Sequence, residues 1–342
     1  MQPNFISAET NTEKLYQLNS FLKRLAGDVD WEAFRPLLSV LRKAQPKGGR
    51  PPFDVVLMFK IIVLKSQYNL SDEMTEFFIR DRKTFQDFLG IIPYHTIPDA
   101  KTIWLFAERM KNAGLEEKLF DKFLEMLESK GIHPQGGTLV DGAFVEVPRP
   151  RNTKSENAQL KKGEIPEEFK SNPHRLAQKE CDGNWAKKGS AAFFGYKDHP
   201  WVDVFWKLMW GYAVTPAAVY DSVPCLDVIP EKPHPGCEEA YGDSAYSGKA
   251  VAEELLKRGY DPRICGKGYR NHPLTETQKE SNRLKSKVRC RIEHVFGEQK
   301  MRMKDETLRS IGFARAKFWI GMRNLGSNIS RYLSLKKLGK VN

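Results

Sequence analysis

The spacing of apolar residues changes near Gly136, and this change limits the possible folds more than any other feature of the sequence. Before it, apolar residues recur at intervals of three and four, which predicts an all-α region from Asn11 to about Gly131. After it, short runs rich in β-branched residues alternate with helical patterns. The chain is therefore predicted to be α/β, with a helical N-terminal domain at residues 1–131 and, at residues 132–342, a mixed sheet flanked by helices.

The individual elements follow from these patterns. In the first region, helices are predicted at 15–25, 53–68, 70–78, 84–89, 102–113 and 115–127. In the second region, strands are predicted at 138–147, 191–196, 202–206, 209–214, 217–220, 239–243 and 263–266. Further helices are predicted at 249–259 and 282–303. The segment from Pro148 to Lys188 is polar and irregular, and a loop of this length usually indicates function or disorder.

The positive charge is concentrated at the C-terminal end. The 342 residues include 55 Lys and Arg and 43 Asp and Glu, which gives a net charge of +12. Residues 1–280 have no net charge, whereas residues 281–342 hold sixteen cations and four acids. Apolar and aromatic residues at helical spacing in the same segment predict packed, basic helices. Such a surface favours nucleic acid as the partner, before a membrane, and a merely solvated face is the alternative.

The N-terminal region contains one strongly basic block, in which Arg50 belongs to the hinge-like run 48–52 and follows further cations. Arg50 is therefore predicted to contact DNA. Residues 57–78 are compatible with a helix-turn-helix motif that reads DNA, although a scaffold or dimer surface would leave the same pattern.

Several classes of protein are excluded or disfavoured. No apolar stretch approaches the ~20 residues that a membrane-spanning helix requires. The first ten residues lack the pattern of a secretory signal, so a cytoplasmic location is expected by default. The five cysteines are odd in number and widely spaced, which predicts reduced side chains and disfavours both a disulfide framework and a zinc site.

Two aspartates are the strongest candidates for catalysis. Asp141 lies inside the strand predicted at 138–147, and Asp243 ends the strand predicted at 239–243. A carboxylate among apolar residues is costly to bury unless it is paired or binds a metal ion. Both residues are therefore predicted to be functional.

A third acid lies in the basic segment. Arg289, Glu293 and Lys300 are spaced so that they share one face of the predicted helix. Three carboxylates can hold two Mg²⁺ ions about 3.5–4 Å apart for phosphoryl transfer, while nearby cations hold the phosphate backbone. The alternative for Glu293 is a surface pair with Arg289, which is worth only ~0.3–0.5 kcal/mol.

The motifs around these acids resemble a known family. They are Leu139-Val140-Asp141-Gly142, Tyr241-Gly242-Asp243-Ser244-Ala245-Tyr246 and Arg289-x3-Glu293-x6-Lys300. Together they are similar to the acidic triad of the bacterial DDE transposases of the insertion-sequence family five group. The resemblance extends along most of the chain, through Phe194-Gly195-Tyr196-Lys197-x-His199, Asp221-Ser222 and Gly49-Arg50-Pro51-Pro52. One departure is Ser286, which stands where the family often has Tyr and puts an aromatic contact to the DNA end in doubt.

The resemblance implies an RNase H-like catalytic domain, with Asp141 on the first strand, Asp243 on the fourth and Glu293 on a following helix. These acids would be both the catalytic residues and the ligands of divalent metal, two Mg²⁺ or Mn²⁺ ions. The implied activity is binding of terminal inverted repeats, cleavage of the DNA ends, and joining of the freed 3′-OH to target DNA by a homo-oligomer. The DNA contacts predicted from charge and resemblance together are Arg50, Arg283, Lys285, Lys287, Arg289 and Lys300.

Other interpretations remain open at this stage. The same residues fit a decayed transposase that acts as a DNA-binding repressor, or a metal-dependent nuclease that cuts without joining. Asp203 or Asp221 could serve as an ancillary or replacement ligand. His199 and His294 are predicted to be structural or to lie beside DNA. Tryptophans at 201, 206 and 210 could stack on unpaired bases, but their strand setting favours core packing.

Overall fold

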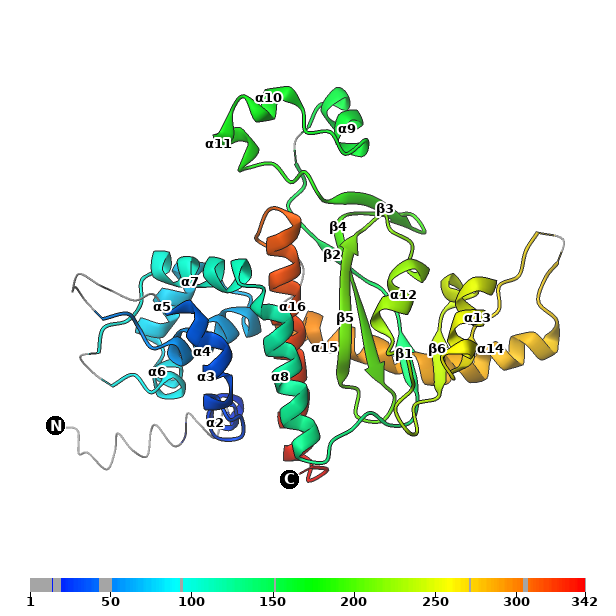
Figure 1. Ribbon diagram of the computed structural model, residues 1–342, viewed down its shortest axis with the longest axis horizontal. Coiled ribbons are helices and arrows are strands. Elements are labelled where there is room, and N and C mark those ends of the chain that lie inside the picture. Colours follow the sequence, from blue (N-terminus) through cyan, green and yellow to red (C-terminus); the bar gives the residue numbers. More distant parts are fainter. Residues whose placement is uncertain are drawn as a thin grey trace. The chain divides into compact units, whose positions relative to one another are not determined.

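Figure 1 shows a computed structural model of the chain, which describes residues 14, 20–42, 51–92, 95–150, 152–270, 272–303 and 307–341. The chain folds as two compact units. One contains the described residues up to Met126 together with those from Leu325 onward, and the other spans Leu127–Asn324. The predicted mixed α/β class is confirmed, whereas the functional division at residues 131 and 132 stays a prediction.

Helices build the first unit. They are α2 (Ser20–Gly27), η1 (Glu32–Phe34), α3 (Arg35–Leu38), η2 (Ser39–Leu41), α4 (Val55–Gln67), α5 (Asp72–Asp81), α6 (Lys83–Leu89), α7 (Ala100–Asn112), most of α8 (Leu115–Ser129) and the end of α16 (Phe313–Lys337). Trp31 packs in the core of this unit, where its ring centroid lies 5.8 Å from that of Phe59 and 5.5 Å from that of Phe88. Part of the helix predicted at 15–25 lies outside the described residues, and the others form close to the predicted positions.

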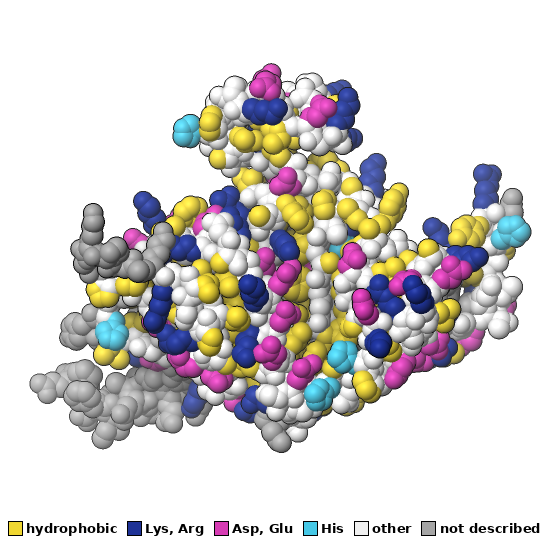
Figure 2. All heavy atoms as spheres, in the orientation of Figure 1, with side chains coloured by type: hydrophobic (Ala, Val, Ile, Leu, Met, Phe, Trp, Pro, Cys, Tyr) yellow, Lys and Arg dark blue, Asp and Glu magenta, His cyan; other side chains and the backbone are white. Residues whose placement is uncertain are grey.

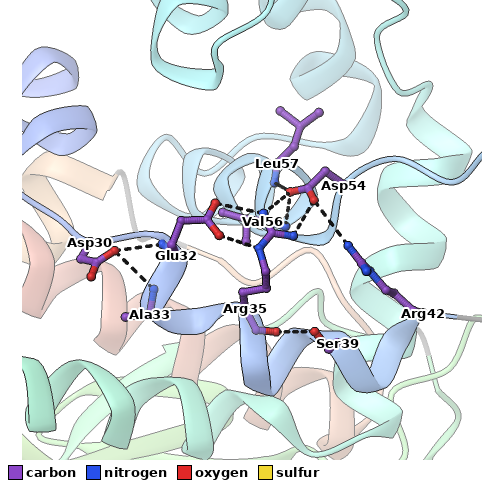
Figure 3. Close-up of polar contacts among 9 residues, drawn as sticks. All are labelled: Asp30, Glu32, Ala33, Arg35, Ser39, Arg42, Asp54, Val56 and Leu57. Atoms are coloured by element: carbon purple, nitrogen blue, oxygen red, sulfur yellow. Dashed lines mark hydrogen bonds and ion pairs between the residues drawn. The ribbon is translucent and has the colours of Figure 1, made fainter.

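Asp54 organises the start of α4 (Figure 3). Its Oδ1 accepts hydrogen bonds from the amides of Val56 and Leu57 at 2.9 and 3.1 Å, so it caps the helix. Its Oδ2 pairs with Nη1 of Arg35 at 2.6 Å, and Arg35 also pairs with Glu32. The buried α4 is thereby tied to α3 through one carboxylate.

We expect Asp54→Ala to lower the free energy of unfolding by about 1–2 kcal/mol, because two helix amides lose their acceptor. Asp54→Asn keeps a capping oxygen and loses only a partly exposed ion pair, which is worth under about 1 kcal/mol. Urea unfolding followed by circular dichroism compares the two variants. Equal destabilisation by Asn and Ala would show that the ion pair, rather than the cap, holds the helix.

A mixed sheet forms the centre of the second unit (Figure 1). Its strands are β1 (Thr138–Val140), β2 (Ala143–Glu146), β3 (Asn184–Lys188), β4 (Ala191–Asp203), β5 (Met209–Pro216), β6 (Glu239–Gly242) and β7 (Asp261–Ile264). β4 pairs antiparallel with β1, β2, β3 and β5, whereas β1, β6 and β7 run parallel to one another. The helices of this unit are α9 (Lys154–Lys161), α10 (Glu167–Lys170), α11 (Pro173–Leu176), α12 (Ser222–Val228), η3 (Ser244–Tyr246), α13 (Lys249–Lys257), α14 (Glu276–Arg289), α15 (Arg291–Met303) and the start of α16.

The strand predicted at 138–147 is interrupted at Asp141 and Gly142, so the prediction of a single strand was wrong. β1 and β2 keep one register along β4, which sets Asp141 opposite Pro200 and Gly142 opposite His199. A proline has no amide hydrogen to give to a strand ladder, which favours an interruption there. Asp141 therefore lies at a corner just past the carboxyl end of β1 rather than within a strand.

Four other expectations about elements need correction. The strand predicted at 191–196 and the start of the one predicted at 202–206 belong to one strand, β4, while residues 204–206 form a turn. The strand predicted at 217–220 is also a turn. The region from Pro148 to Lys188 contains three short helices and β3 instead of a long loop; Figure 1 shows α9, α10 and α11 as a group outside the sheet. The helix predicted at 282–303 is two helices, which are separated at Cys290.

Two exclusions drawn from the sequence can be compared with the structure. No helix among the described residues is long and apolar enough to cross a membrane. The five cysteines are all free thiols. Cys225, Cys237 and Cys265 are buried, in agreement with the prediction of reduced side chains.

Candidate active site

Parallel pairing of β1 with β6 brings the two predicted aspartates together. Leu139 is in register with Tyr241. Asp141 lies two residues after Leu139, and Asp243 lies two residues after Tyr241. Both residues therefore follow the carboxyl ends of neighbouring parallel strands. The pKa of Asp141 is raised to about 6, mainly by burial and also by the negative charge of Asp243.

Arg289 joins Asp141 to the third acid. Its Nη1 donates to Oδ2 of Asp141 at 3.0 Å, and its Nη2 lies 3.3 Å from Oε1 of Glu293. Asp141 and Arg289 have side chains that are 16% and 21% exposed, whereas that of Glu293 is 61% exposed. The structure thus brings two acids together directly and the third through a guanidinium group. Arg289 ends α14 and Glu293 lies in α15, so they do not share one helix as predicted.

Local hydrogen bonds fix the backbone around the two aspartates. The amide of Gly142 donates to Oδ1 of Asp141 at 2.8 Å. The amide of Ala245 donates to Oδ1 of Asp243 at 2.7 Å, so Asp243 caps the short helix η3. Each carboxylate is therefore oriented by the backbone that follows its strand.

The α14–α15 corner is also fastened to the sheet. Asn282 exchanges two hydrogen bonds of 2.9 Å with Gly266, just beyond β7. At the start of α15, Nη1 of Arg291 donates to the carbonyl of Val204 at 3.2 Å, and Nδ1 of His294 lies 2.8 Å from Nζ of Lys207. These contacts hold α14 beside the end of β7 and the start of α15 beside the turn that follows β4.

The donor set suits a hard divalent cation in part. The carboxylates of Asp141 and Asp243 supply the oxygen ligands that Mg²⁺ and Mn²⁺ prefer. Within the described part of the chain, however, no three His, Cys, Asp or Glu side chains are grouped closely enough to hold a metal ion. The residues present thus offer two carboxylates of the kind that a divalent ion prefers, and Glu293 is linked to Asp141 only through Arg289.

The residues predicted to contact DNA differ in their solvent exposure and in whether the fold already uses their charge. Arg283, Lys287 and Lys300 are exposed. Lys285 donates to the carbonyl of Ile264 at 2.9 Å, so its charge is partly committed to the fold. Arg50 lies outside the described residues. On the face drawn in Figure 2, Lys and Arg side chains over α13 and α14 stand among acidic ones rather than forming a patch of one sign.

The other polar candidates have mainly structural contacts. The buried Asp203 accepts hydrogen bonds from the amides of Trp206 and Leu208 at 2.6 and 3.0 Å and from Nε1 of Trp210 at 3.0 Å, which shapes the turn between β4 and β5. Trp201 is buried in the core, with its ring 6.3 Å from that of Trp210. Packing therefore accounts for this pair.

Sequence reasoning missed two residues near the site. The charge of Lys188 on β3 lowers the pKa of Asp141, and the buried Tyr246 has its own pKa raised by burial and by surrounding carboxylates. Lys188 lies in the segment expected to be irregular, where no pattern indicated a strand. Tyr246 could have been found, because it belongs to the motif that contains Asp243.

Comparison with known proteins identifies the family. One solved structure, a piggyBac transposase synaptic complex with hairpin DNA, is similar with a TM-score of 0.42 and 10% identity, over 90% of this chain and 72% of that chain. A score of this size does not establish a shared fold. Residues 10–109 match the model of a transposase domain (DUF772), and residues 132–329 match that of the transposase DDE domain. The second match alone covers more than half of the sequence, so the chain belongs to the DDE transposase family.

Proposed function

We propose that this transposase binds the terminal inverted repeats of an insertion sequence of the family five group, cleaves the DNA ends and joins them to target DNA. One observation carries the proposal: Asp141 and Asp243 meet at the ends of neighbouring parallel strands, with Glu293 attached to Asp141 through Arg289. The family match supports DNA as the substrate.

An RNase H-like fold for the second unit is part of the proposal. If β1 and β2 count as one interrupted strand, and β3, which pairs only with β4, is left out of the count, then β4, β5 and β6 are the second, third and fourth strands. Asp141 then follows the first part of strand one, Asp243 follows strand four, and Glu293 lies on a later helix. This placement supports the arrangement that the acidic motifs imply.

The residues of the site have distinct proposed roles. Asp141, Asp243 and Glu293 would hold the divalent ions, which when bound would activate the attacking oxygen and stabilise the leaving one. No side chain needs to form a covalent bond to DNA, because water and then a DNA 3′-OH can attack in turn. Arg289 orients Asp141 and Glu293, and Lys300 contacts a phosphate. We further propose that a homo-oligomer holds the two ends.

A joining assay tests the proposal. Labelled duplexes from the DNA that flanks the coding sequence are incubated with the protein, Mg²⁺ and a plasmid. Joined product is expected, and chelation of Mg²⁺ should remove it while leaving binding to the duplex intact. Cleavage without joining would instead indicate a nuclease, and binding alone would indicate a repressor.

A further inference from the structure

Two polar side chains lie near the backbone directly after Asp141. Gly142 is opposite His199 in the register of β4. A methyl group on Gly142 would be 2.8 Å from Oδ1 of Asp221 and 3.1 Å from Nδ1 of His199. Only a residue without a Cβ fits such a close approach. The corner that carries Asp141 therefore packs directly against Asp221 and His199.

A buried cation holds Asp221 in this position. Lys197 and His199 are two residues apart on β4, so they face the same side of the sheet. Nζ of Lys197 lies 2.8 Å from Oδ1 of Asp221 and 2.9 Å from the carbonyl of Val219. The side chain of Lys197 is only 9% exposed and that of Asp221 is 24% exposed. An ion pair this deep loses much hydration, so it adds little to stability compared with apolar packing.

His199 completes the cluster as a neutral group. Its Nε2 lies 2.8 Å from Oγ1 of Thr215, and burial lowers its pKa to about 4. Its buried Nδ1 has no hydrogen-bond partner in the described part of the chain and is 3.9 Å from Oδ1 of Asp221. A polar atom is thus left facing the corner, where an apolar residue would cost less.

Asp221 also faces the same buried phenol as the proposed catalytic acids. The carboxylates of Asp141, Asp221 and Asp243 all add to the effect of burial in raising the pKa of Tyr246. Even so, these acids form no group of three, among the residues described, that could hold a metal ion. Asp221 is therefore next to the site without being arranged as a ligand.

We propose that Lys197, His199 and Asp221 are positioning residues that hold the Asp141–Gly142 corner, and with it the Asp141 carboxylate, in the geometry that metal binding and DNA cleavage require. This inference rests on the function proposed above for Asp141. The cluster acts through contact with the backbone and contributes no ligand. Asp221 is its central member, because it contacts both Lys197 and the corner.

The test substitutes Asp221→Asn, Lys197→Met and Lys197→Arg in the full chain. Asp221→Asn and Lys197→Met should slow cleavage of DNA ends about 10- to 100-fold, as expected when a group that orients a metal ligand is removed. Lys197→Arg keeps the cation and should recover most of the activity. DNA-end affinity should stay within twofold of wild type, because the cluster is not a DNA contact.

A second readout does not depend on activity. Mn²⁺ that binds the folded protein raises its Tm. The Mn²⁺ concentration for half of this rise should increase about 10- to 100-fold in Asp221→Asn. The control is Glu254→Gln on α13, where Glu254 pairs with Arg258 at 3.1 Å with similarly small exposures of 32% and 19%. This variant should match wild type in both measurements.

Each outcome decides the inference. If Asp221→Asn behaves like Glu254→Gln, the cluster does not position Asp141. A loss as complete as that of Asp141→Asn would make Asp221 a ligand and overturn the positioning role. If Asp221→Asn fails to fold, the comparison of Lys197→Arg with Lys197→Met decides instead. If wild type itself cleaves no DNA, the proposed function fails, and the Mn²⁺ readout still supports or refutes the cluster.

Discussion

Replacing Asp141 by Asn, Asp243 by Asn or Glu293 by Gln should each reduce DNA cleavage and joining by about 10³-fold or more. Each change removes a proposed anionic ligand, and a metal ion contributes several kcal/mol of transition-state stabilisation. The three losses should not add, because we propose that the acids act as one unit. Gel assays of labelled end duplexes with a plasmid target measure cleavage and joining separately.

A matched control for this prediction is Asp261→Asn. Asp261 begins β7, so it lies at the opposite end of the parallel strands from the site, and its side chain is 52% exposed and paired with Arg263. This variant should retain wild-type activity. Undiminished joining by any one of the three acid variants would exclude that acid from the catalytic set.

Removing three exposed cations should make DNA binding much less sensitive to salt. In the variant Arg283→Ala/Lys287→Ala/Lys300→Ala, the slope of log affinity against log salt should become shallower by about 0.9 for each phosphate that is no longer neutralised, or about 3 in all. Affinity at low salt should fall steeply for every DNA sequence, because binding to phosphates carries no sequence information. Fluorescence anisotropy over a range of salt concentrations measures both quantities.

Lys285 and α13 provide the controls. Lys285→Ala should change the slope less, since its Nζ already donates to the carbonyl of Ile264. Lys249→Ala/Lys257→Ala removes two cations of α13 whose side chains are 88% and 79% exposed. If this pair flattened the slope as much per charge as the triple variant, the effect would reflect net charge instead of a DNA-binding surface.

The sequence signals that point to the candidate site are local. An acid at the end of an apolar strand is visible in a few residues, as for Asp141 and Asp243. What brings them together is the pairing of β1 with β6, about a hundred residues apart, and no local pattern encodes that pairing. The break at Asp141 was missed for the same reason, because Pro200 opposes it on a different strand.

β4 is one strand where two were predicted, and it shows why polar residues mislead a local prediction. Lys197, Asp198 and His199 interrupt the apolar pattern and suggested two strands. In the structure, Asp198 pairs with Arg323 at 3.0 Å and Lys197 with Asp221 at 2.8 Å, so distant segments satisfy the charges inside one strand. These partners are set by tertiary structure, and the positioning cluster was therefore not predictable from spacing.

The helices α9 to α11 were missed although one signal was present. Thr153 and Glu156 form a reciprocal capping box at the start of α9, a pattern visible in the sequence. The low apolar content of the segment outweighed it. The separation of α14 from α15 has no comparable signal, because Cys290 ends α14 through its backbone angles, with ψ of −11°.

We propose that Asp141, Asp243 and Glu293 form one divalent metal site. Isothermal titration calorimetry with Mn²⁺, in the absence of DNA, tests this site in wild type, Asp141→Asn/Asp243→Asn and Asp261→Asn. Wild type and Asp261→Asn are expected to bind Mn²⁺ with equal affinity, and the double variant to lose that binding. Unchanged Mn²⁺ affinity in the double variant would contradict the claim.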